Sequence, residues 1–201
     1  MWDLERSWYS CALKIALGFV LACAVFSASC ATFYVDASAP NDSGKGSQNA
    51  PKKHVTSGLS LLSRSGGDTL VIRSGKYDHP FDAIARTTPL FNGASGKVNT
   101  IRAEADGVAV ISAGFELPLA SANLVFEGIK WAGHTPKSIV GNEIKFLRCA
   151  FKDGLQSGNN ATLVIGTNDR LPGASRILVE DSWVYGKGGR YRVLVYNAEK
   201  V

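Results

Sequence analysis

Cysteine is scarce in this sequence, and its distribution excludes an internal disulfide framework. Four cysteines occur in 201 residues, and Cys11, Cys23 and Cys30 all fall within the first thirty. Beyond them the sequence has only Cys149, so the rest of the chain must be stabilised by a hydrophobic core and by backbone hydrogen bonds. Cys149 lies in an apolar run, where we expect a buried and inert thiol rather than a nucleophile.

Several motifs of well-known enzyme classes are also missing. No Gly-x-Ser-x-Gly elbow, Walker loop or dinucleotide-binding fingerprint occurs. The histidines His54, His79 and His134 have neither metal-ligand spacing nor a triad pattern. The loop Asn41–Gly46 lacks the acidic spacing and closing Glu of an EF-hand, so a structural Asx turn is expected there. Spacing alone therefore predicts no metal site.

The first residues have the pattern of an export signal. Ile15–Ser29 is an apolar run with the length of a signal-peptide core, and it is short for a membrane span. Cleavage is predicted after Ser29 or Ala31. The segment ending in Cys30 is also a loose lipobox, which leaves open acylation of Cys30 and membrane attachment through the lipid, as well as an uncleaved anchor. We assign residues 1–31 as a signal peptide and expect a secreted, periplasmic or cell-surface protein.

The charge balance is modestly basic. The formal net charge is +5, and the basic residues are dispersed, with small groups at Lys52-Lys53 and at Lys187–Arg192. Nucleic-acid binding would need a denser basic stripe interleaved with exposed aromatic residues, so no nucleic-acid partner is expected. On an exported protein, this excess of positive charge fits an acidic polysaccharide.

Short apolar runs bounded by Gly, Asn, Asp and Pro follow the leader and predict β-strands. These runs are Phe33–Val35, Thr69–Arg73, Thr100–Arg102, Val108–Ser112, Asn123–Glu127, Ile129–Trp131, Glu143–Phe146, Thr162–Ile165, Ile177–Glu180 and Val193–Tyr196. Helical spacing is found only in His54–Ser63, with Val55, Leu59 and Leu62 on one face. Residues 32–201 are therefore predicted to form one all-β domain.

Three of these segments repeat one another. Leu124–Trp131 matches Ile144–Phe151 at an offset of twenty residues, and Ile177–Val184 repeats the pattern thirty-three residues later. A period near twenty with loops of variable length is typical of a β-solenoid, in which each coil buries its apolar face only against its neighbours. The terminal residues of the three segments are predicted to form an internal ladder. Trp183 falls one position out of step, and we favour core packing over sugar stacking for it.

The segment Phe33–Tyr77 resembles the N-terminal region of right-handed parallel β-helix proteins of the pectate-lyase-like superfamily. There, a polar loop leads to a capping helix, then Gly-Asp-Thr, a β-run and Gly-x-Tyr. The corresponding elements here are Asn41–Gly44, Val55–Leu62, Gly67–Thr69, Leu70–Arg73 and Gly75–Tyr77. The resemblance implies a right-handed parallel β-helix with an N-terminal capping helix. Members usually run to several hundred residues, so we expect a C-terminally incomplete domain.

The superfamily contains lyases, hydrolases, epimerases and non-catalytic adhesins, so its fold does not fix an activity. The resemblance and the positive charge favour an exported, monomeric polysaccharide lyase that cleaves an acidic, uronate-containing glycan by β-elimination. The alternative is a non-catalytic glycan-binding or structural β-helix protein of the cell surface.

The Gly-rich segment Glu180–Arg192 carries the candidate site. β-Elimination needs a base beside the uronate carboxylate, a cation that neutralises this carboxylate, and a proton donor for the leaving oxygen. The candidate bases are Lys187 and Arg190, and the candidate substrate-binding residues are Asp181, Arg192 and Lys152. In similar lyases, Ca²⁺ held by carboxylates often neutralises the uronate, so the resemblance leaves Ca²⁺ open as a cofactor. The competing interpretation of this segment is a surface turn with weakly paired charges.

Overall fold

The computed structural model describes residues 30–135, 137–156, 160–167 and 173–201. The predicted signal peptide lies almost entirely outside these ranges. The described residues form strands β1–β16, the short helix α1 and the 3₁₀-helix η1. Every pairing between two of these strands is parallel. The predicted all-β class is confirmed.

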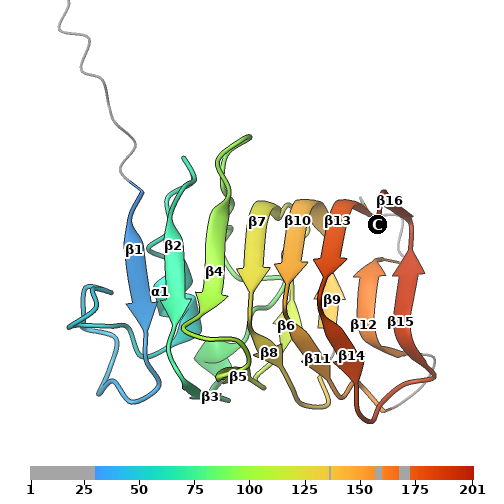
Figure 1. Cartoon of the computed structure of the whole chain (residues 1–201), viewed down its shortest axis with the longest axis horizontal. Coiled ribbons are helices and arrows are strands. Elements are labelled where there is room, and N and C mark those ends of the chain that lie inside the picture. The colour runs from blue at the N-terminus through green and yellow to red at the C-terminus, as the bar shows by residue number, and fades with distance from the viewer. Residues whose placement is uncertain (1–29, 136, 157–159, 168–172) are drawn as a thin grey trace, which may run out of the picture.

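The strands form three sheets (Figure 1). Sheet 1 has the order β1 (Thr32–Val35), β2 (Thr69–Ile72), β4 (Asn99–Ala103), β7 (Ala122–Glu127), β10 (Gly141–Leu147), β13 (Ala174–Glu180) and β16 (Ala198–Glu199). Sheet 2 has the order β14 (Trp183–Tyr185), β11 (Ala150–Lys152), β8 (Lys130–Trp131), β5 (Ala109–Ile111) and β3 (Gly75–Tyr77). Sheet 3 has the order β15 (Tyr191–Tyr196), β12 (Ala161–Gly166), β9 (Lys137–Ile139) and β6 (Phe115–Glu116).

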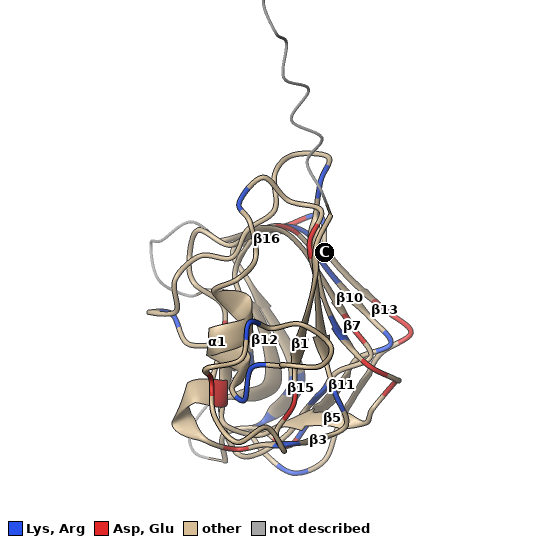
Figure 2. Ribbon diagram, turned by 90° about the vertical axis from the view of Figure 1, so that its left-hand side faces the viewer, with Lys and Arg blue, Asp and Glu red and all other residues tan. Residues whose placement is uncertain are grey.

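From β7 onward the chain visits sheets 1, 2 and 3 in turn and then returns to sheet 1. We call one such passage a circuit. Each circuit adds one strand to every sheet, and neighbouring strands lie about 4.8 Å apart. Leu124 pairs with Ile144, and Ile144 pairs with Ile177, as the repeat in the sequence predicted. Seen from the β1 end, sheet 1 lies on one side and β3 and β5 of sheet 2 lie along the lower edge (Figure 2).

Large apolar side chains stack along the inside of the sheets. In sheet 2, Trp131 pairs with Phe151 and Phe151 with Val184, so the predicted ladder is confirmed. Tyr77 and Ile111 extend it by two strands towards β3. All of these except Val184 are fully buried.

Aromatic rings of sheets 1 and 3 meet the ladder in the centre. The Phe126 and Phe146 rings stack with centroids 4.9 Å apart, and the Trp131 and Phe115 rings lie 4.1 Å apart. Such pairs add stability beyond the area they bury.

Each corner of a circuit uses left-handed backbone at the same place. Between sheets 1 and 2 the left-handed residues are Gly128, Arg148 and Asp181, with φ of 66°, 51° and 48°. Left-handed residues also recur near the starts of the sheet 1 strands, at Asn123, Glu143 and Arg176. A third set follows the sheet 2 strands, at Gly133, Asp153 and Gly186. L-residues rarely adopt this conformation because Cβ crowds the following carbonyl. Its recurrence means that successive corners share one geometry, which keeps the strands in register.

Helix α1 (Val55–Leu59) is shorter than the predicted helix His54–Ser63. The chain continues through Leu62 in tighter turns, since Leu61 N–H donates to the Gly58 carbonyl and Leu62 N–H to the Leu59 carbonyl. Val55, Gly58 and Leu59 are buried, and α1 contacts β1 and β2. Its role as an end cap stays a prediction. No helix among the described residues is long and apolar enough to cross a membrane.

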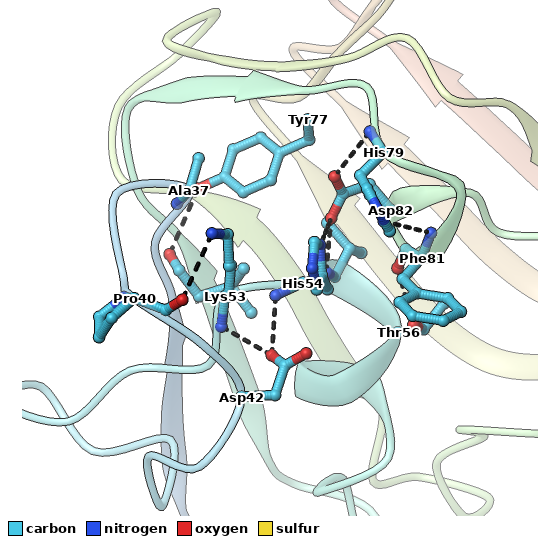
Figure 3. A network of polar contacts seen from close by, with 12 residues as sticks. Ala37, Pro40, Asp42, Lys53, His54, Thr56, Tyr77, His79, Phe81 and Asp82 are labelled. Carbon is cyan, nitrogen blue, oxygen red and sulfur yellow. Dashed lines mark hydrogen bonds and ion pairs between the residues drawn. The ribbon is translucent and has the colours of Figure 1, made fainter.

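Two carboxylates fix the start of α1 (Figure 3). Asp42 accepts hydrogen bonds from the backbone N–H groups of Lys53 and His54, at 2.8 and 3.0 Å. Asp82, from η1 (Pro80–Asp82), accepts from Val55 N–H at 3.0 Å and lies 3.3 Å from His54 Nδ1. These bonds satisfy backbone N–H groups at the start of α1, because the side chain of the N-cap residue His54 makes no capping hydrogen bond.

The polar loop before α1 is also architectural. Ser43 N–H donates to Asn41 Oδ1 at 2.8 Å, which is the predicted Asx turn. Asp68 of the Gly67–Thr69 segment is buried and accepts from the N–H groups of Ala31 and Ser63, at 2.9 and 2.7 Å. The Asx turn shapes the loop, and Asp68 joins the start of β1 to the segment after α1.

The ladder predicts a large difference between two adjacent side chains of β11. Phe151 points inward, and we expect Phe151→Ala to lower the free energy of unfolding by about 3–5 kcal/mol through lost burial and a cavity. Lys152→Ala, on the opposite face, should cost less than about 0.5 kcal/mol. Urea unfolding followed by circular dichroism measures both values. Equal losses in the two variants would contradict the inward ladder.

Candidate functional site

The outward residues of sheet 2 form a surface that is both basic and aromatic. Because side chains alternate along a strand, the neighbours of the buried ladder point outward. Lys130 pairs with Ala150 and Ala150 with Trp183, which places them in one outward row. A second row pairs Lys152 with Tyr185. We call the surface formed by Lys130, Lys152, Trp183 and Tyr185 the sheet 2 outer face.

Both aromatic rings of this face meet the solvent. The exposed fraction is 73% for Trp183 and 39% for Tyr185. The expectation that Trp183 packs in the core is wrong, because Val184 takes the inward position of β14 and strand alternation turns Trp183 outward. The two rings therefore present apolar surface to the solvent on the same face of sheet 2 as Lys130 and Lys152. The small side chain of Ala150 leaves the Trp183 ring accessible from the β11 side.

The Gly-rich bend after β14 is attached to the bend of the previous circuit. Lys187 N–H donates to Asp153 Oδ1 at 2.7 Å, and the Lys187 carbonyl accepts from Gly154 N–H at 2.7 Å. Gly189 N–H donates to the Leu155 carbonyl at 2.9 Å. A Cβ at Gly188 would overlap the Gly154 backbone, so the close approach of the two bends requires glycine there.

Asp153 is the electrostatic centre of this corner. The hydrogen bond from Lys187 N–H lowers the pKa of Asp153 below its usual value; burial opposes this, and the nearby Lys152, His134 and Lys137 reinforce it. Lys152 Nζ lies 3.9 Å from Asp153 Oδ2. The carboxylate therefore stays ionised at neutral pH and anchors the bend.

Lys137 lies beneath the same corner but serves the structure. Its side chain is buried, and Nζ donates to the carbonyls of Gly133, Thr135 and Asp153, at 2.7, 3.3 and 2.5 Å. Burial lowers the pKa of Lys137 to about 8. All three donors of the ammonium group are engaged and the group is covered, so Lys137 cannot reach a polymer on the surface.

The structure divides the predicted site residues into two groups. Lys187 and Arg190 lie on the bend between β14 and β15, and Arg192 lies on β15, where Nη1 donates to the Gly188 carbonyl at 3.3 Å. Lys152 is close to this corner because it precedes Asp153. Asp181 lies at the opposite end of β14, separated from the bend by three strand residues, or about 10 Å.

Arg190 is placed by an aromatic neighbour. Its guanidinium carbon lies 5.6 Å from the centroid of the Tyr191 ring, within the range of a cation–π contact. Both residues are exposed, so the cation is presented to the solvent at the end of the bend.

The carboxylates do not converge on a cation site. Asp153 follows β11 and Asp181 follows β13, so they lie at opposite ends of the short sheet 2 strands. In the described ranges, no three His, Cys, Asp or Glu side chains are grouped so that they could hold a metal ion. The described residues therefore do not fit the carboxylate cluster that Ca²⁺ needs, and we derive no step through Ca²⁺.

Two lysines at or beneath this surface, Lys130 and the buried Lys137, were not singled out from the sequence. Lys130 precedes Ala150 by the twenty-residue repeat, so the repeat could have identified it. Lys137 gave no signal, because its partners are backbone carbonyls of three separate positions.

The two described cysteines differ in environment. Cys149 is buried as predicted, and burial raises the pKa of its thiol to about 11. Cys30 is exposed and free just before β1, and its lipidation stays a prediction.

Comparison with known proteins gives one structural likeness. No family model and no curated protein sequence matches the chain. The structure is similar to a solved chain named rhamnogalacturonan lyase, with a TM-score of 0.54 and 14% sequence identity over 85% of this chain. The match covers 62% of that chain, so this chain spans less than two thirds of its length. At this identity, the likeness concerns the fold alone.

The role of Asp153 leads to a matched pair of substitutions. Asp153 and Asp181 both have left-handed backbone, which asparagine tolerates. Asp153→Asn should speed hydrogen exchange of the Lys187 amide about fivefold, equivalent to about 1 kcal/mol, because a charged acceptor is lost. Asp181→Asn should leave this rate unchanged.

The same bond gives a pH dependence. Because the pKa of Asp153 is lowered from 3.8 in the folded protein, its contribution is complete above that value and is lost as the pH falls through the folded pKa. The Lys187 amide shift in NMR should therefore titrate below pH 3.8. Titration of the Lys187 amide shift at or above pH 3.8 would contradict this anchor. Equal exchange rates of the Lys187 amide in the two variants would also contradict it.

Proposed function

We propose that the chain is a right-handed parallel β-helix protein that holds an acidic polysaccharide on the sheet 2 outer face. The observation that carries this proposal is the pairing of exposed Trp183 and Tyr185 with Lys130 and Lys152 on one face of adjacent strands. The apolar faces of sugar rings stack on aromatic side chains, and ammonium groups attract uronate carboxylates. The surface therefore supplies the two kinds of contact that such a polymer needs.

The β-helix part of the proposal rests on topology. Each circuit adds a strand to three parallel sheets, and connections between parallel strands are right-handed in nearly all proteins. Helix α1 covers the first strands as an end cap would. We further propose that residues 1–31 are an export signal, that residues 32–201 belong to a longer β-helix domain, and that the exported protein is a monomer.

The reaction that we propose is β-elimination. Lys187 or Arg190 takes the proton from the carbon beside the uronate carboxylate, and Arg192 and Lys152 neutralise that carboxylate. The electron pair of the broken C–H bond forms a carbon–carbon double bond, the bond to the leaving glycosidic oxygen breaks, and this oxygen takes up a proton from water. The anchored bend supports this assignment because the Lys187 backbone is fixed on both sides. The likeness to a rhamnogalacturonan lyase supports a polysaccharide lyase as the class.

A second candidate is a non-catalytic glycan-binding protein. A specific observation favours it: Asp181 lies at the other end of β14 from Lys187, so the corner combines cations with a single structural carboxylate. Binding needs only the sheet 2 outer face. The two candidate functions therefore assign different roles to the bend after β14 and the same role to the sheet 2 outer face.

The binding surface is tested with two exposed aromatic residues. Trp183→Ala should weaken binding of polygalacturonate about tenfold, equivalent to about 1.4 kcal/mol, because the stacking platform is lost. Phe81→Ala is the matched control, since Phe81 is 60% exposed but lies on η1. Isothermal titration calorimetry measures both. Equal effects of the two variants, or no binding by the unaltered protein, would overturn the proposed surface.

The reaction is tested by absorbance of the unsaturated product on pectate, alginate and glycosaminoglycans, with and without added Ca²⁺. We expect product from the unaltered protein and at least a hundredfold loss of rate in Lys187→Ala or Arg190→Ala, typical of a lost catalytic base. Binding without product on any of these polymers would favour the non-catalytic candidate. Product formation that survives both substitutions would remove these residues as bases.

A further inference from the structure

The row of outward side chains that contains Lys130 and Trp183 continues beyond the sheet 2 outer face. Lys76 of β3 pairs with Val110 of β5, and Val110 pairs with Lys130. Lys130 pairs with Ala150 and Ala150 with Trp183, so one row crosses all five strands of sheet 2. These strands follow one another along the long axis of the molecule (Figure 1). We call this set of five residues the five-strand row.

The neighbours of the row along each strand show that its first members point outward. The residues that follow the row in β3, β5 and β8 are all buried, namely Tyr77, Ile111 and Trp131. Since side chains alternate across a strand, Lys76 and Val110 face away from the core. Lys76 is exposed and Val110 is half-buried, as this orientation requires. The row is therefore a continuous surface feature from β3 to β14.

The ammonium group of Lys76 is free to bind an anion. It makes no hydrogen bond or ion pair with another described residue. Asp78, the nearest acid along the chain, follows β3 and forms no ion pair with Lys76 in the described structure. The carboxylates of Asp106 and Glu127 flank the row where the chain leaves sheet 1, and Arg148 binds both of them. A ligand carboxylate at the β3 end of the row would therefore meet an unpaired cation.

The length of the row determines how a polymer can contact both of its ends. Four strand intervals of about 4.8 Å separate β3 from β14, so Lys76 lies about 19 Å from Trp183 along the row. The strands of sheet 2 have at most three residues, or about 10 Å, so a polymer laid along β14 would not reach Lys76. A polymer laid across the strands passes both residues. Because one sugar of an extended chain is nearly as long as one strand interval, about five sugars cover the row.

We propose that Lys76 is a remote binding residue for an acidic polysaccharide that runs across the strands from Trp183 to Lys76. This inference rests on the proposed function and adds the direction and the extent of the bound chain. Trp183 stacks on one sugar ring, and Lys130 and Lys76 bind uronate carboxylates further along. Val110 and Ala150 are small and apolar, so the chain can lie close to the sheet between the charged groups. The bend after β14 is at the Trp183 end, so Lys76 contributes to binding and not to the chemical step.

The test compares galacturonate oligomers of two to six units by isothermal titration calorimetry. We expect the affinity of the unaltered protein to rise with length up to about five units. Lys76→Ala should weaken binding of the hexamer about fivefold, equivalent to about 1 kcal/mol. It should leave binding of the trimer unchanged, because a trimer stacked on Trp183 ends at β8. Lys145→Ala is the matched control, since Lys145 is exposed but points outward from β10 of sheet 1.

NMR titration locates the bound chain directly. The hexamer should shift the amides of Lys76 and Val110, and the trimer should leave both unchanged. Equal affinities of trimer and hexamer, equal effects of Lys76→Ala and Lys145→Ala, or no shift of the β3 amides would overturn this inference and leave the proposed binding surface in place. No binding of any oligomer would instead overturn the proposed function, and this inference with it.

Discussion

Parallel backbone hydrogen bonds join each strand to the circuit before it and the circuit after it, and the rest of the structure depends on the register of these bonds. A slip of one residue would turn every inward side chain outward. The corners protect the register because left-handed residues recur at equivalent places, as at Gly128, Arg148 and Asp181. With corners of one geometry, the inward-pointing stack from Tyr77 to Val184 stays aligned across five strands.

The same register creates the surface on which we place the function. The pairing that buries Phe151 against Trp131 sets Ala150 between Lys130 and Trp183 on the other side. Core and binding face are therefore two sides of one arrangement. The bend after β14 is positioned in a similar way, since Asp153 of one circuit holds Lys187 of the next at 2.7 Å.

The sequence predicted features that depend on repetition and missed those that depend on corners. The ladder Trp131, Phe151 and Val184 follows from equal spacing of apolar segments, so the offsets of twenty and thirty-three residues were sufficient. Asp181 and Lys187 were grouped because they are six positions apart, but an intervening strand separates them.

Two other features could not be predicted for different reasons. The helix was predicted too long because the apolar spacing continues through Leu62, although the hydrogen bonding changes to tighter turns. A hollow of about 500 Å³ lies where four strands from different circuits begin, so no local sequence pattern predicts it. For the site as a whole, the sequence identified the cations Lys187, Arg190 and Arg192 near the bend after β14. It did not predict the outward row of Lys130, Ala150 and Trp183, because that row depends on pairing between strands of different circuits.

Hydroxyl-radical footprinting with polygalacturonate oligomers tests the central claim most directly. The register predicts that bound oligomer protects Trp183 and Tyr185 from oxidation, because both rings lie on the sheet 2 outer face. It also predicts that Phe81, a ring on η1 that is 60% exposed and so lies between Trp183 and Tyr185 in accessibility, keeps its oxidation rate. Protection of Phe81 with unchanged oxidation of Trp183 and Tyr185 would contradict the account.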